Sequence, residues 1–103
     1  MLLSNIDYVP GKECEVLGLV QGNTVQAKHI GRDIMAGFKN MVGGEIESYT
    51  MLLNDARRIA TERMAQSAQQ MGADVVLSVR YATSQIMDGA AEVLAYGTAA
   101  KFT

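Results

Sequence analysis

The chain has 103 residues, 49% hydrophobic and 19% charged, a balance typical of one soluble globular domain covering residues 1–103. The net charge is -2, and the basic residues are scattered along the sequence. A protein that binds nucleic acid or an anionic membrane would be expected to have a stripe of basic residues, so the sequence argues against both functions. No signal-peptide core follows Met1, and no run approaches the ~20 apolar residues that span a bilayer. The single cysteine, Cys14, fits a reducing compartment, so we expect a cytoplasmic protein.

The first part of the chain predicts two short strands and a short helix. Residues 14–21 are apolar enough for a strand, Gly22-Asn23 is a turn signal, and residues 24–27 predict a short strand that pairs back. Residues 31–41 fit a short helix with apolar side chains on one face. Gly43-Gly44 then breaks that helix before a longer one.

A long helix dominates the middle of the chain. Ser48 is suited to cap its start and Gly72 to end it in a left-handed conformation. At ~1.5 Å per residue it would be roughly 35 Å long, enough to cross a small sheet. On a 3.6-residue wheel one face is apolar. This face carries Tyr49, Leu52, Leu53, Ala56, Ile59, Ala60, Met64, Ser67 and Met71.

Two more strands follow the helix. Residues 75–81 are rich in β-branched side chains, residues 82–89 predict a polar excursion, and residues 91–102 alternate as a final strand. The element order β-β-α-α-β-β therefore predicts an α+β fold. We expect a two-layer sandwich with one long helix on an antiparallel sheet.

This architecture leaves one face of the sheet without cover. The segments 16–20, 75–79 and 93–99 are apolar on both sides, yet one helix covers one side. A bare apolar face of several hundred Å² indicates a partner surface, so we expect a homo-oligomer. Val79 and Val93 are the predicted subunit-interface residues.

Arg63 falls inside the apolar stripe of the long helix, where an unpaired guanidinium is unfavourable. Two interpretations are open. Arg63 either lies at the rim with its aliphatic stem against the protein, or pairs with a carboxylate such as Asp33 or Glu45 across a subunit boundary. The second would make it an interface residue.

Several segments resemble one family closely. They are LGLVQGNTVQAKHIGRDIMAGFKNMVGG (17–44), EIESYT (45–50), MGADVV (71–76) and IMDGAAEVLAYGTA (86–99). The sequence is similar to the YbjQ family over nearly its whole length. The resemblance implies a dodecin-like subunit of a ring-shaped homopentamer whose sheets meet in the middle. Members are labelled heavy-metal-binding, and no catalytic residue set is carried over.

A site for a soft metal ion needs cysteine or histidine ligands, which carboxylates can supplement. The chain has one cysteine and one histidine, so Cys14, His29 and a carboxylate such as Asp33 are the candidate ligands, with a soft metal ion as the candidate cofactor. Repetition around a ring would multiply them. The same three residues supply the types for nucleophilic catalysis without its spacing, so no catalytic residue is predicted, and a small hydrolase or isomerase is a remote alternative.

A second hypothesis is a dodecin-like protein that binds or stores a small organic ligand between subunits. The candidate residues are Tyr81, Met87 and Tyr96, which lie on or beside the two C-terminal strands. Both hypotheses describe a binding protein rather than an enzyme.

Overall fold

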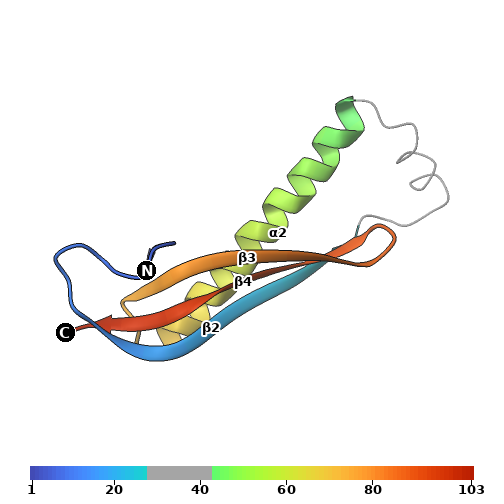
Figure 1. Ribbon diagram of the computed structural model, residues 1–103. Helices are drawn as coiled ribbons and strands as arrows, with labels where there is room; N and C mark the ends of the chain where they lie inside the picture. The colour runs from blue at the N-terminus through green and yellow to red at the C-terminus, as the bar shows by residue number, and fades with distance from the viewer. Residues whose placement is uncertain (28–42) are drawn as a thin grey trace.

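The computed structural model describes residues 1–27 and 43–103 as one sheet crossed by one long helix (Figure 1). The strands are β1 (Leu2–Leu3), β2 (Cys14–Ala27), β3 (Val75–Met87) and β4 (Ala90–Phe102), and the helix is α2 (Gly43–Gln70). The strand order is β1-β3-β4-β2. The two-layer α+β architecture predicted from the sequence is confirmed, while the short helix predicted for residues 31–41 lies outside the described residues.

The sheet is mixed, not wholly antiparallel as predicted. β3 and β4 form a hairpin around Asp88 and Gly89, where Gly89 has φ 77°, and β2 pairs antiparallel with the other side of β4. β1 pairs parallel with the start of β3. Because β1 comes from the extreme N-terminus, nothing in its two residues predicts this pairing direction.

Two of the predicted strand breaks are wrong. β2 is continuous through Gly22 and Asn23, which pair with Ala95 and Leu94 of β4. β3 likewise continues to Met87 through the segment expected to be a polar excursion. In both places β4 supplies a hydrogen-bonding partner along the whole length, and this pairing overrides the local turn and loop preference.

Helix α2 begins at Gly43, earlier than the predicted cap at Ser48, and ends as predicted. Gly72 has φ 84°, and the amides of Gly72 and Ala73 donate to the carbonyls of Gln69 and Ala68. This left-handed ending satisfies carbonyls that the last turn leaves free. Met71, expected on the buried face, lies past the helix end and is exposed.

The core lies between α2 and one face of the sheet. Core positions recur at every fourth helix residue, and alanine at three of these four positions lets the helix lie close to the strands. The helix contributes Ala56, Ala60, Met64 and Ala68, and the sheet contributes Val20, Val76, Val79, Val93, Ala95 and Ala99. The closest approach is at Gly22, where a Cβ atom would overlap the backbone nitrogen of Met64.

The N-terminal segment covers part of the other face of the sheet. Val75, Leu77 and Ala100 are buried there, with Val9 and Phe102 packed against them. Backbone bonds tie this segment to β3, because the amides of Ser78 and Val79 donate to the carbonyls of Ile6 and Ser4. Ser78 has φ 54° within a bulge of β3, so the strand bends at this attachment.

In the described part of the chain, no helix combines the length and apolar character needed to cross a membrane.

Candidate functional site

The candidate site is the part of the sheet that neither α2 nor the N-terminal segment covers. Along β2 and β4 every second residue is buried under the helix, so the residues between them point to the opposite side. We call this side the open face. It carries Leu19, Gln21, Asn23 and Val25 from β2 and Glu92, Leu94, Tyr96 and Thr98 from β4.

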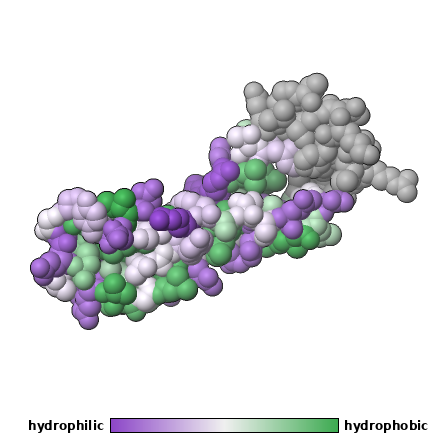
Figure 2. Space-filling model, viewed as in Figure 1, coloured by the Kyte–Doolittle hydropathy of each residue, from purple (hydrophilic) through white to green (hydrophobic). Residues whose placement is uncertain are grey.

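Apolar side chains on the open face are strongly exposed. Leu19 is 73% and Val25 is 53% solvent-exposed, and Leu94 and Tyr96 are half-buried. Asn23 donates from Nδ2 to Glu92 Oε2 at 3.2 Å, so polar groups interrupt the apolar surface. Figure 2 shows this mixture as separate hydrophobic patches among polar ones. Exposed apolar side chains that gather on one face in this way are typical of an interaction site.

Val79 and Val93, the predicted interface residues, do not lie on the open face. Both are buried in the core cluster beneath the chain's own helix. The sequence correctly predicts strands that are apolar on both sides, but it does not say which side α2 takes. Leu19, Val25 and Tyr96 are the residues that the structure leaves available to a partner.

Arg63 lies at the rim of the helix. Its side chain is exposed, and Nη1 donates to the backbone carbonyl of Asn23 at 2.7 Å. The guanidinium therefore reaches across the edge of β2 and satisfies a strand carbonyl. This geometry matches the interpretation that Arg63 lies at the rim. The alternative was an ion pair with Asp33 or Glu45 across a subunit boundary. Asp33 lies outside the described residues, and the side chain of Glu45 is not described.

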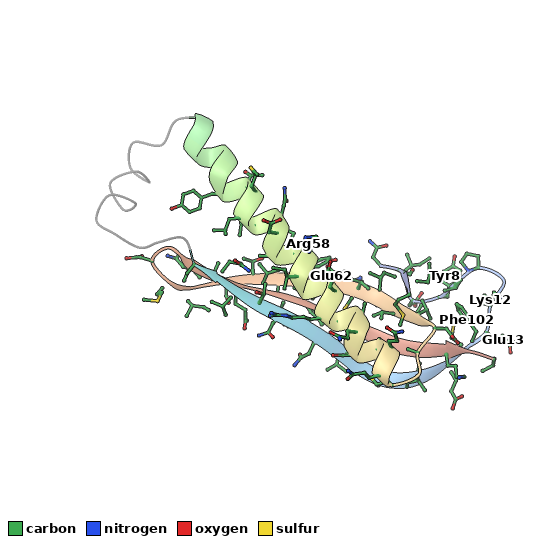
Figure 3. The ribbon with its side chains drawn as sticks, turned by 180° about the vertical axis from the view of Figure 1, so that it is seen from behind. Tyr8, Lys12, Glu13, Arg58, Glu62 and Phe102 are labelled. Atoms are coloured by element: carbon green, nitrogen blue, oxygen red, sulfur yellow. The ribbon has the colours of Figure 1, made fainter. Side chains whose placement is uncertain are left out.

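Cys14 begins β2 and is half-buried. It pairs in register with Phe102 and packs beside Val75, Leu77 and Ala100. Figure 3 shows Phe102, Lys12, Glu13 and Tyr8 gathered at this end of the sheet, with the Lys12 Nζ 5.3 Å from the centre of the Phe102 ring. Cys14 thus contributes to packing between the N-terminal segment and the strands.

The other two predicted metal ligands, His29 and Asp33, lie outside the described residues. Ala27, two residues before His29, ends β2 and is therefore at the opposite end of the strand from Cys14. At roughly 3.3 Å per residue these ends are ~40 Å apart. Cys14 therefore lies far from the point at which β2 ends.

Among residues 1–27 and 43–103, no three His, Cys, Asp or Glu side chains come together as a group that could hold a metal ion. A metal site that includes Cys14 therefore needs ligands from beyond this part of the chain or from another subunit.

Tyr81, Met87 and Tyr96 do not form one surface within the subunit. Tyr81 pairs with Ala95, which is buried beneath α2, whereas Tyr96 follows Ala95 and points to the open face. Met87 is at the hairpin end and is 58% exposed. The structure thus distributes these three residues over both faces and the tip.

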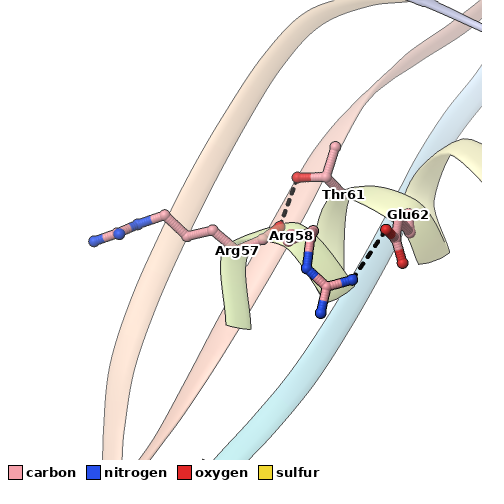
Figure 4. Close-up of polar contacts among 4 residues, drawn as sticks. All are labelled: Arg57, Arg58, Thr61 and Glu62. Carbon is pink, nitrogen blue, oxygen red and sulfur yellow. Dashed lines mark hydrogen bonds and ion pairs between the residues drawn. The ribbon is translucent and has the colours of Figure 1, made fainter. Parts of the chain in front are cut away.

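A polar contact between α2 and β3 was not predicted. The hydroxyl of Thr61 donates to the Arg57 carbonyl at 2.6 Å (Figure 4) and lies 2.8 Å from the hydroxyl of Tyr81. Because Thr61 has used its proton, Tyr81 is the donor in the second bond. The nearby Arg58–Glu62 ion pair, at 3.1 Å, joins exposed residues four apart on the helix.

Comparison with known proteins supports the resemblance drawn from the sequence. A YbjQ family model described as "Putative heavy-metal-binding" matches residues 1–103. A UPF0145 protein of Alkaliphilus metalliredigens is 53% identical over 102 residues, covering 99% of both chains. A UPF0145 protein of Archaeoglobus fulgidus is 56% identical over 102 residues, covering 98% of this chain and 94% of the relative.

The same fold occurs in a crystal structure of a protein with unknown function from Pediococcus pentosaceus, of the DUF74 family. Its TM-score is 0.67 at 14% sequence identity, and the match covers 100% of this chain and 98% of that one. At this identity the similarity concerns the fold alone. The full-length family match and the relatives at more than 50% identity show that this chain belongs to the YbjQ family of UPF0145 proteins.

Proposed function

We propose that this chain is the subunit of a homo-oligomeric binding protein, a pentameric ring of dodecin-like subunits that holds a heavy-metal or metalloid ion with ligands from more than one subunit. The observation that carries the oligomer is the open face. Its exposed Leu19 and Val25 lie on a sheet whose other side the chain's own helix already covers. Burial of this apolar area against further copies would stabilise the assembly by about 25 cal/mol per Å².

The metal is supported by the description of the family and by residue chemistry. Thiolate and imidazole are ligands that soft and borderline ions prefer, and the chain supplies one of each in Cys14 and His29. Since the length of β2 separates Cys14 from the end of the strand that precedes His29 in sequence, equivalent residues of neighbouring copies, or carboxylates such as Asp33 of another copy, complete the coordination. Oligomerisation is therefore part of the binding mechanism.

Zinc and cadmium titration of the purified oligomer tests this function. We expect stoichiometric binding that weakens at least tenfold in Cys14→Ser or His29→Ala. Gln66→Ala is the matched control, because Gln66 is exposed on α2 and supplies no soft ligand. Tight binding that survives Cys14→Ser and His29→Ala together would refute this ligand assignment.

A second candidate is favoured by the apolar surface at the far end of the hairpin. Ile86 and Met87 are exposed there, at the end of β3 next to the hairpin turn. A dodecin-like oligomer could hold a small organic ligand between such surfaces. Mass spectrometry under native conditions separates the two candidates, because it reports a retained organic molecule or a retained metal by mass.

A further inference from the structure

The sheet has two free edges that face away from each other. β2 forms one edge, and within residues 1–27 and 43–103 no strand pairs with its outer side. β3 forms the other edge along its second half. The N-terminal segment bonds to β3 as far as Val79, and from Arg80 to Met87 the described residues place no strand beside it.

Both edges contain a β-bulge, near Leu17 in β2 and near Ile86 in β3, but the stretches between bulges lack the charges and proline that block pairing. Natural edge strands are usually short, or carry charges or proline that block association. β2 has 14 residues, and from Val16 to Ala27 it contains neither a charged residue nor proline. The same is true of β3 from Tyr81 to Met87. Unpaired N–H and C=O groups on such strands are templates for another strand, and in β2 the Asn23 carbonyl, which accepts from Arg63, would have to be released or left out of the pairing.

The two free edges also lie at the same height along the strand direction. Across the sheet, Ser84 of β3 is in register with Glu92 of β4, and Glu92 is in register with Val25 of β2. Both outer strands run antiparallel to β4 and therefore parallel to each other. Rotation of copies about an axis along the strands would bring the β2 edge of one copy to the β3 edge of the next.

We infer that neighbouring copies join edge to edge, with β2 of one subunit pairing in parallel with the Tyr81–Met87 half of β3 in the next. This inference rests on the proposed homo-oligomer and specifies its contact. Such a contact is head-to-tail, and it closes when the rotation completes a ring. Along this half of the strands the sheets then form one closed barrel, with the open face lining the interior and α2 outside.

Cysteine crosslinking tests this arrangement in a Cys14→Ser background. Val25→Cys is combined in turn with Ala82→Cys, Ser84→Cys or Ile86→Cys, because strand tilt in a barrel shifts the register between subunits. We expect oxidation of at least one pair to give a ladder of covalent oligomers from dimer up to the full ring. Each chain carries both cysteines, so it can be crosslinked to a neighbour on each side. Val25→Cys alone should give no ladder.

A second pair controls for random contact. Val25→Cys with Lys101→Cys joins positions at opposite ends of the sheet, because Lys101 pairs with Glu15 near the start of β2. Dimers alone from Val25→Cys would show face-to-face packing and overturn the edge contact. The native mass of each variant is measured in parallel. An intact oligomer with no ladder from any pair refutes edge pairing and leaves the proposed oligomer standing, whereas a folded monomer refutes both.

Discussion

Gly22 determines how closely the helix lies over the sheet. A Cβ atom at this position would overlap the Met64 backbone nitrogen and lie 2.5 Å from the Ala60 carbonyl oxygen. Neither group is the flexible end of a side chain, so the helix itself would have to move. We predict that Gly22→Ala lowers the free energy of unfolding by about 1–3 kcal/mol, as overpacking does, measured by urea denaturation.

Gly11→Ala is the matched control. Gly11 has φ 76°, and nothing lies within 4 Å of a Cβ built there, so backbone conformation alone is affected. Its effect should stay near 1 kcal/mol. Equal losses in both variants would contradict the close helix–strand contact at Gly22.

Arg63 provides a test of the rim geometry. It is exposed and donates to the Asn23 carbonyl, so Arg63→Ala should cost about 1 kcal/mol or less. Arg58→Ala, which removes an exposed side-chain pair with Glu62, is the comparison. A loss of about 3–5 kcal/mol in the Arg63 variant would instead indicate a buried ion pair across a subunit boundary.

At the scale of elements, the Tyr81–Thr61 bond joins β3 to α2 on the outer side of the core. We predict that Tyr81→Phe and Thr61→Val are each destabilising and that a double-mutant cycle gives a coupling of about 0.5–1.5 kcal/mol. The measurement is the unfolding free energy of the four proteins. Tyr8→Phe, an exposed change on the N-terminal segment, is the control, and zero coupling would show that the hydroxyls act independently.

The sequence predicts those elements whose pattern is set by burial. β4 alternates between Val93, Ala95, Gly97 and Ala99 on one side and Leu94, Tyr96 and Thr98 on the other, and this division is confirmed. Gly22-Asn23 has the composition of a turn, yet Gly22 is needed for helix contact inside a continuous strand. A glycine in such a pair can therefore indicate either a turn or a close helix contact, and long-range packing decides which of the two occurs.

At the scale of the whole molecule, the sequence predicts that a partner surface exists but not which face of the sheet forms it. Strands apolar on both sides indicate a second partner surface, and the open face supplies one. The side that α2 covers depends on the path between β2 and α2, which strand periodicity does not encode. Val79 and Val93 are therefore core residues, and Leu19 and Val25 take their place in the proposed interface.

The open face itself can be tested by one charge. Leu19→Lys would place an ammonium from every copy on the open face that lines the interior of the proposed ring, where burial and mutual repulsion oppose assembly. We predict smaller species in sedimentation at micromolar concentration with the helical circular dichroism retained, since Leu19 is exposed within the subunit. Gln66→Lys on the exposed side of α2 is the control and should leave assembly unchanged.

The central claim is that this chain functions as an assembly of identical copies. Native mass spectrometry of the purified wild-type protein tests it most directly, because each chain contributes 11.1 kDa to the observed mass. We predict a pentamer at micromolar concentration, with any retained metal ion or ligand visible as added mass. A soluble monomer that does not bind a hydrophobic dye would contradict the account.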